Sequence, residues 1–224
     1  SQSRGFKVDA EQVVISSGTE YLFYIIFKLF NNKIYGLENP CHKMFKELFL
    51  TNNISFKAIS LDENGIVIDD LKKYDVNIAY VTPSHQFPTG AIMSISRRTE
   101  LLNWANENPD RYIVEDDYDS EFKYTGRPIP ALKANDINDK VIYLGSFSKS
   151  ISPAIRVSYL VLPKALLNIY QRELPYFICP VPTLNQKILY RFIKDGYFVK
   201  HINKMRTLYK KKREFLVNTI KTYS

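Results

Sequence analysis

The sequence lacks the features that mark exported, membrane-spanning or zinc-binding proteins. Only two cysteines, Cys41 and Cys179, occur among 224 residues, and no companion ligands lie near either one. They indicate neither a disulfide framework nor a zinc site. The opening segment SQSRGFKVDAEQ is polar and gives no sign of a signal peptide. The longest apolar run, YLFYIIFKLF, is short for a membrane span and contains Lys28. A reducing cytoplasm is the expected location, with no membrane contact.

The chain also lacks internal repeats, low-complexity tracts and any obvious linker. Apolar residues make up 45% of the composition, which is enough for a sizeable core. We therefore expect residues 1–224 to form one good-sized domain, or part of a larger protein.

Acidic residues are scarce in one segment. Eight Lys and Arg residues lie between Lys200 and Lys221 against the single acid Glu214, so this segment carries +7 of the total charge of +8. The pattern predicts a long amphipathic helix with a basic outer face. Such a face is usually only solvated, and contact with DNA is the alternative. The apolar residues that recur there at roughly helical spacing are Phe198, Ile202, Met205, Tyr209, Leu216 and Ile220.

What is present is an alternation of strand and helix patterns. This order is typical of an α/β domain with a mostly parallel sheet, whose ligands bind beyond the carboxyl ends of the strands. Helices are predicted from Gly18 onward, over 42–50 and over 96–108, and the turn DENG follows the third strand. Strands are predicted over 13–16, 33–38, 55–60, 77–82, 112–115, 141–146 and 157–162.

Polar clusters follow four of these strands. In SSGTE, Gly18 and Thr19 open a helix, where free N–H groups and the helix dipole suit a phosphate, although the same pair also serves as a simple cap. TPSHQFPTG, residues 82–90, is more elaborate than a plain connection requires. YLGSFSKSISPAIR brings Lys149 and Arg156 after an apolar run. Such a loop captures a phosphate and a carbonyl, or it is a serine-rich loop with two ordinary surface cations.

The fourth cluster, EDDYDSEF, begins with three acids and a tyrosine at the end of an apolar strand. Carboxylates at such a position are costly unless they are solvated or paired. A magnesium site is one alternative, but no histidine lies close enough in sequence to support a metal centre.

Four strings together resemble one known family: TPSHQFPTG, EDDYDSEF, YLGSFSKSISPAIR and QKILYRFIKDGYFVKHINKMRTLYKKKR. They are similar to the aminotransferase-like domain of bacterial transcription regulators of the MocR/GabR type, in the GntR family. The resemblance runs from about Arg4 to the C-terminus in the family's order and spacing. It implies the large domain of a fold-type-I aminotransferase, which binds pyridoxal 5′-phosphate (PLP). That domain has a mostly parallel sheet of the seven-stranded type, flanked by helices.

The resemblance implies a role for each matching residue. Lys149 forms the Schiff base with the cofactor aldehyde. Asp116 keeps the pyridine nitrogen protonated, so that the ring remains an electron sink, and Tyr118 hydrogen-bonds near the phenolic oxygen. The planar fork of an arginine can meet two phosphate oxygens at once. The residues that hold the phosphate are Gly18, Thr19, Glu20, Ser146, Ser148 and Arg156.

Three positions depart from aminotransferase or family patterns. His42 stands where the family usually stacks an aromatic ring on the cofactor, and an imidazole offers less area and a titratable charge. Glu20 replaces a common glutamine, so its carboxylate is expected to point away from the phosphate. Phe87 stands where true aminotransferases carry an asparagine that bonds the phenolic oxygen. The regulators share that exchange, which argues against efficient transamination.

The resemblance further implies an effector-sensing role, in which an amine or amino acid is captured as an external aldimine. It implies a homodimer, because a partner subunit completes fold-type-I sites. DNA contact would come only through a winged helix-turn-helix domain that this chain does not contain. A C-terminal subdomain with a carboxylate-binding arginine is expected beyond Ser224. A stand-alone aminotransferase is the alternative function, and a DNA-binding module based on the last helix is a third.

Overall fold

Eight strands form one sheet in the computed structural model, which describes residues 4–122 and 129–223. Their order is β1-β8-β7-β6-β5-β2-β3-β4, and only β8 and β4 run against the others. The predicted α/β class and mostly parallel sheet are therefore confirmed. The strands are β1 (Val13–Ser16), β2 (Tyr35–Asn39), β3 (Phe56–Asp62), β4 (Gly65–Ile66), β5 (Ile78–Val81), β6 (Tyr112–Asp117), β7 (Val141–Ser146) and β8 (Ser158–Val161).

One of the eight strands, β4, was not predicted. It has two residues and follows the DENG turn, whose Gly65 has a φ of 122° that favours glycine. The turn returns the chain beside β3, where Leu61 pairs with Ile66. A strand of this length leaves no periodic pattern in the sequence, so only its turn was recognisable.

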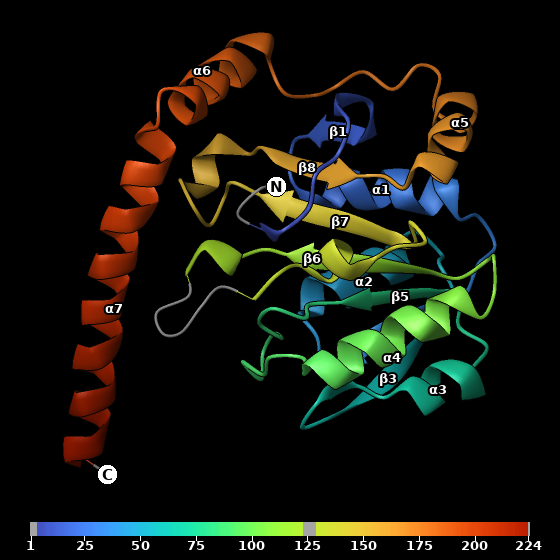
Figure 1. Ribbon diagram of the computed structural model, residues 1–224, viewed down its shortest axis with the longest axis horizontal. Coiled ribbons are helices and arrows are strands. Elements are labelled where there is room, and N and C mark those ends of the chain that lie inside the picture. Colours follow the sequence, from blue (N-terminus) through green and yellow to red (C-terminus); the bar gives the residue numbers. More distant parts are fainter. Residues whose placement is uncertain (1–3, 123–128, 224) are drawn as a thin grey trace.

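Helices cover both faces of the sheet (Figure 1). One face packs against α1, α2 and α5, and the other packs against α3 and α4. Burial on both faces explains why central strands such as β5, IAYV, are apolar throughout. The helices are α1 (Thr19–Leu29), α2 (Lys43–Thr51), α3 (Ile68–Lys73), α4 (Ile95–Asn106), α5 (Lys164–Glu173), α6 (Thr183–Lys194) and α7 (Tyr197–Tyr223).

An aromatic cluster fixes α1 against the sheet. The Phe23 ring lies between α1 and the strands, with centroid distances of 5.9 Å to Phe49 on α2 and 5.3 Å to Tyr80 on β5. Leu22 and Ile26 are fully buried beside it. This packing holds the N-terminus of α1 at the edge where the strands end.

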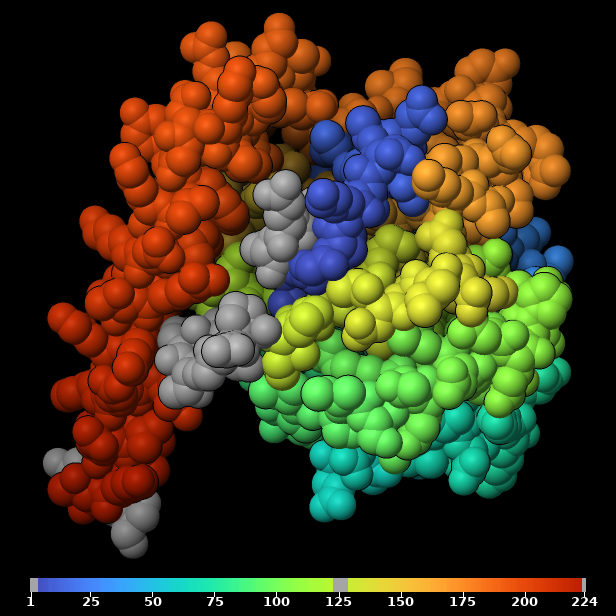
Figure 2. Space-filling view, in the orientation of Figure 1, coloured from blue at the N-terminus to red at the C-terminus, as the bar shows by residue number. Residues whose placement is uncertain are grey.

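The predicted basic helix is present as α7, which has 27 residues. Its first part packs on the body through Ile202, which is 4% exposed, whereas Phe215 is 74% exposed. Figures 1 and 2 show the rest of the helix running along one side of the molecule. Within the described residues, none of the helices has the length and apolar character needed to cross a bilayer.

Candidate functional site

A cavity of about 410 Å³ lies at the carboxyl ends of β2, β5 and β6, beside the N-termini of α1 and α2. This is the edge at which a parallel sheet presents its ligands. Five of the predicted site residues line the cavity: Thr19, His42, Asp116, Tyr118 and Lys149. The other lining residues are Glu38, Cys41, Met44, Phe45, Tyr80, Thr82, His85, Phe87 and Asp119.

Asp116 provides a buried carboxylate at one end of this cavity. The residue is 7% exposed, and its Oδ2 accepts a hydrogen bond of 2.7 Å from the Tyr80 hydroxyl. Burial raises the pKa of Asp116 to about 7, although the hydrogen bond from Tyr80 opposes the rise. A carboxyl group in this state becomes more acidic when a cation binds beside it, so it is suited to pair with a protonated ligand nitrogen.

The two acids on either side of Asp116 in EDDYDSEF, Glu115 and Asp117, are paired rather than free. Asp117 accepts from the Arg4 guanidinium at 2.6 Å. Glu115 accepts from the backbone N–H groups of Leu132 and Lys133 at 2.7 and 2.9 Å. The expectation that these acids need partners is confirmed. No group of three or more His, Cys, Asp or Glu within the described ranges could hold a metal ion, so the magnesium alternative has no ligand set there.

Glu38 ties the end of β2 to the TPSHQFPTG loop. Its Oε2 accepts from the Thr82 backbone N–H at 3.2 Å and from the Thr82 hydroxyl at 2.6 Å. Gln86 donates from the same loop to the carbonyl of Pro40 at 2.8 Å. Burial raises the pKa of Glu38 to about 7. These bonds hold the loop as one wall of the cavity.

His42 and Phe87 form an aromatic pair on the cavity wall. Their ring centroids are 5.0 Å apart, at an interplanar angle of 41°. Nδ1 of His42 accepts from the Met44 backbone N–H at 3.2 Å, so the imidazole also caps α2. Phe87 contributes apolar surface and no hydrogen-bonding group.

Tyr118 lies against His85, the histidine of the TPSHQFPTG loop. The Tyr118 hydroxyl donates to the His85 carbonyl at 3.0 Å, and the rings stack at 6.2 Å with an interplanar angle of 19°. Nδ1 of His85 lies 2.7 Å from Oδ2 of Asp119. Burial, together with the nearby carboxylates of Asp119 and Asp116, raises the pKa of Tyr118 above its usual value, so the phenol keeps its proton.

Gly18, Glu20 and Arg156 meet beside Thr19, which lines the cavity. Gly18 is the N-cap of α1, with a φ of 93°, and a Cβ there would lie 2.1 Å from Nη2 of Arg156. That nitrogen donates to Oε2 of Glu20 at 3.0 Å. The Glu20 carboxylate therefore lies against the guanidinium that is predicted to hold the phosphate, and its direction beside a bound phosphate stays a prediction.

The serines shape the loop that carries Lys149. Oγ of Ser146 accepts from the Ser148 backbone N–H at 3.1 Å and from the Ser158 hydroxyl at 3.2 Å. The next turn is held by α7, because Nε2 of His201 donates to the carbonyl of Ser150 at 3.0 Å. Ser146 and Ser148 thus support the loop, while Lys149 itself lines the cavity.

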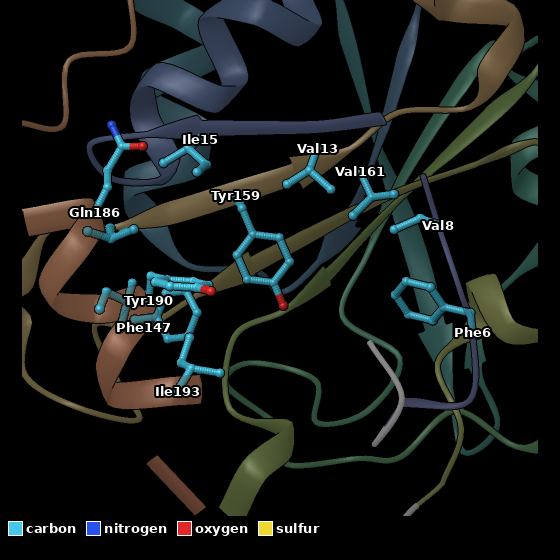
Figure 3. A pocket seen from close by; sticks show the side chains of 12 residues that line it. Phe6, Val8, Val13, Ile15, Phe147, Tyr159, Val161, Gln186, Tyr190 and Ile193 are labelled. Atoms are coloured by element: carbon cyan, nitrogen blue, oxygen red, sulfur yellow. The ribbon is translucent and has the colours of Figure 1, made fainter. Parts of the chain in front are cut away.

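A second hollow, of about 340 Å³, lies on the face of β1 and β8 that α1 does not cover (Figure 3). Tyr159 points across it, and Gln186 and Tyr190 of α6 approach from one side. None of the described residues that line it is charged. Its apolar lining residues are Phe6, Val8, Val13, Ile15, Phe147, Val157, Val161, Leu189 and Ile193.

Glu38, Tyr80, His85 and Asp119 are among the residues of the first cavity that were not predicted individually. Tyr80 lies in a buried strand and looks like an ordinary core residue in the sequence. Glu38 stands before an Asn-Pro pair, with no sign of its buried partners. His85 and Asp119 lie inside the strings TPSHQFPTG and EDDYDSEF, so those strings were the signal that could have found them.

The family model for aminotransferase class I and II matches residues 2–223. The uncharacterized HTH-type transcriptional regulator YdeL of Bacillus subtilis is 43% identical over 98% of this chain, which covers 47% of that protein. The probable rhizopine catabolism regulatory protein MocR of Rhizobium meliloti is 32% identical over 96% of this chain, which covers 44% of it. The chain thus spans about half the length of these curated relatives.

Solved aminotransferases share the fold. Kynurenine aminotransferase of Pyrococcus horikoshii matches 93% of this chain with a TM-score of 0.82 and 29% identity, and the match covers 54% of that enzyme. LysN, the α-aminoadipate aminotransferase of Thermus thermophilus, matches 96% with a TM-score of 0.83 and 28% identity, over 57% of its own length. Because the family model spans nearly the whole sequence and these enzymes share its architecture, the chain belongs to the class I and II aminotransferase family.

Proposed function

We propose that this chain is the PLP-binding, effector-sensing domain of a MocR-type transcription regulator. The observation that carries the proposal is a single cavity bounded both by the Lys149 side chain and by the buried carboxylate of Asp116. The regulator assignment is supported by relatives such as YdeL and MocR, whose names describe transcriptional regulation. The cofactor would serve as the receptor for an amine or amino-acid effector.

The residues present fit PLP. Asp116 offers a buried anion for the pyridine nitrogen, and Tyr118 offers a protonated phenol. Gly18 leaves no space for a Cβ beside Arg156, as expected where a backbone must approach an anion closely. When bound, PLP supplies an aldehyde that captures amines and a ring that withdraws electrons. The solved LysN structure holds N-(5′-phosphopyridoxyl)-L-leucine, and the kynurenine aminotransferase structure holds PMP.

The chain's own residues would bind and orient the cofactor. Lys149 supplies the amine that attaches it, Asp116 holds a proton at the pyridine nitrogen, and Arg156 with the start of α1 binds the phosphate. Phe87 adds no hydrogen bond to the wall. Turnover requires a substrate held in a narrow range of orientations, and an error of about 1 Å costs on the order of a hundredfold in rate. We therefore infer capture of an amine with little or no transamination.

Covalent labelling tests the cofactor assignment. The chain is incubated with PLP, reduced with borohydride and digested, and a pyridoxyl mass is expected on the peptide that contains Lys149. Lys149→Ala should lose the label, whereas Lys57→Ala, a change at an exposed lysine on β3, should keep it. Labelling at another lysine that persists in Lys149→Ala would refute the assignment.

Mixing the PLP-loaded chain with a panel of amino acids tests the sensing role. We expect an effector to shift the absorption spectrum of the bound cofactor while little pyridoxamine phosphate accumulates. Rapid formation of pyridoxamine phosphate, with an equal amount of keto acid, would support the stand-alone aminotransferase instead.

We also propose that the regulator is a cytoplasmic homodimer that reads DNA only through a winged helix-turn-helix domain outside this chain. Among the described residues both cysteines are free thiols, which suits a reducing compartment.

The basic face of α7 would give weak, salt-sensitive contact with the DNA backbone rather than sequence readout. Footprinting that shows one protected sequence at moderate salt would contradict this. Sedimentation of the full-length protein as a strict monomer would contradict the dimer.

A further inference from the structure

Two loops that line the cavity contact each other at Tyr118. Its hydroxyl donates to the carbonyl of His85 at 3.0 Å, and its ring stacks on the imidazole. The imidazole Nδ1 lies 2.7 Å from Oδ2 of Asp119 and 3.4 Å from the Tyr118 hydroxyl oxygen. His85 belongs to the TPSHQFPTG loop, while Tyr118 and Asp119 follow β6. The three side chains therefore join the two segments.

The loop that carries His85 is itself anchored. The carboxylate of Glu38 accepts two hydrogen bonds from Thr82, and the His85 backbone N–H donates to the Thr82 carbonyl at 3.3 Å. The Asp119 side chain is 14% exposed and the His85 side chain is 50% exposed, so the pair forms the outer edge of the cavity. The position of the Tyr118 oxygen is consequently set by a chain of contacts that begins at Glu38.

The Tyr118 oxygen matters because of its neighbour Phe87. Phe87 lines the same cavity and brings no hydrogen-bonding atom to it. When the cofactor is bound, the single hydroxyl hydrogen of Tyr118 would turn from the His85 carbonyl to the phenolic oxygen, while the contacts to His85 keep the Tyr118 oxygen in place. The negative charge of Asp119 contributes to the raised pKa of Tyr118, so it helps to keep the phenol protonated and able to donate.

We propose that His85 and Asp119 are positioning residues that aim the Tyr118 hydroxyl at the phenolic oxygen of the bound cofactor and thereby set the cofactor's proton affinity. The inference rests on the proposed PLP function. A hydrogen bond donated to the deprotonated form of a group favours that form, so loss of the donor should raise the pH at which the bound cofactor releases its proton.

The test is a pH titration of the absorption band of the PLP-loaded chain. Tyr118→Phe should raise the midpoint by about one pH unit, which corresponds to the loss of one hydrogen bond. Asp119→Asn and His85→Gln should each raise it by roughly half as much. His85→Asn should stay nearer the wild type, because its amide nitrogen can take the place of Nδ1 and still donate to Asp119. The control is Asp110→Asn, which breaks the exposed 2.7 Å ion pair with Lys33 and should leave the midpoint unchanged.

Affinity for PLP, measured in parallel, separates positioning from a structural role. Asp119→Asn is expected to weaken binding less than about threefold, since no contact to the phosphate or pyridine nitrogen is lost. The inference is overturned if Tyr118→Phe shifts the titration midpoint while Asp119→Asn and His85→Gln keep the wild-type midpoint. It is also overturned if Asp119→Asn and His85→Gln lose affinity for PLP without a shift of the midpoint. If Asp119→Asn has a lower melting temperature than the wild type, the midpoint of His85→Gln provides the test instead. A wild-type chain that takes up no PLP overturns the proposed function and this inference with it.

Discussion

Two parts of the candidate site are built in opposite ways: the part proposed to meet the pyridine nitrogen (the pyridine end) and the part proposed to bind the phosphate (the phosphate end). At the pyridine end, Asp116 is 7% exposed and fixed by the buried hydroxyl of Tyr80. At the phosphate end, the side chains of Arg156 and Glu20 are 50% and 41% exposed and bond to each other. The pyridine end is buried, whereas the phosphate end is exposed and holds a carboxylate where we propose that an anionic ligand binds.

This difference separates two sources of affinity. A buried carboxylate without a cation destabilises the folded protein, and a cationic ligand removes that destabilisation when it binds. An exposed ion pair such as Glu20–Arg156 contributes only about 0.2–1 kcal/mol and is screened by salt. We therefore expect large effects from changes at the pyridine end and smaller, salt-dependent effects from changes at the phosphate end.

The largest effect should come from Asp116→Asn. The variant keeps an acceptor for the Tyr80 hydroxyl but loses the charge that meets a protonated pyridine nitrogen. Removing one member of a buried charge pair costs about 2–5 kcal/mol, so affinity for PLP should fall by at least about 30-fold in a spectroscopic titration. The control is Asp110→Asn, which makes the same change at an exposed carboxylate outside the cavity. Unchanged affinity in Asp116→Asn would contradict the assignment of Asp116 to the pyridine end.

The same substitution should stabilise the cofactor-free chain at high pH. The pKa of Asp116 rises from 3.8 to about 7, so between those values the folded chain keeps a proton that the unfolded chain has released. Stability from this group is full below about pH 4, falls as the pH rises to about 7 and is then constant. Asp116→Asn should therefore melt at least about 3 °C higher than wild type at pH 8, with little gap at pH 4. Equal melting temperatures of the wild type and Asp116→Asn at pH 8 would contradict the prediction that burial of the ionised Asp116 carboxylate destabilises the folded chain.

Arg156→Lys should have a smaller effect. Lysine keeps the positive charge but loses the planar fork that binds two phosphate oxygens. We expect PLP affinity to fall about tenfold, and inorganic phosphate to compete less well for the site. Arg213→Lys, the same change at an exposed position on α7, is the matched control. An unchanged PLP titration in Arg156→Lys would show that another group holds the phosphate.

The sequence predicted the fold well because each element carries a local signal. The buried strands are continuous apolar runs, and α7 repeats its apolar residues at helical spacing. The buried end of the site was also predictable: an acid at the end of an apolar strand, as Asp116 is, must find a partner. Its partner Tyr80 was not predictable, because a tyrosine in a buried strand has the same pattern whether it packs or donates.

The exposed end was predicted in its residues but not in its geometry. Gly18, Glu20 and Arg156 were expected to converge, and they do. The direction of the Glu20 side chain depends on what else is near Arg156, and Arg156 is 136 residues away in sequence. A pattern of local spacing carries no information about such a contact. Long, half-exposed side chains take their direction from tertiary neighbours and bound ions.

Glu20→Gln should produce the smallest effect, in the opposite direction. Glutamine removes a carboxylate that now bonds Arg156 and that would repel a bound phosphate. Because an exposed pair contributes at most about 1 kcal/mol, PLP should bind roughly two- to fivefold more tightly, and the gain should shrink at 0.5 M salt, where the Debye length is about 4 Å. Pyridoxal, which has no phosphate, should show no gain. Glu47→Gln on α2 removes a charge away from the site and should leave PLP affinity unchanged. Weaker PLP binding in Glu20→Gln would mean that Glu20 orients Arg156 for the phosphate instead of competing with it.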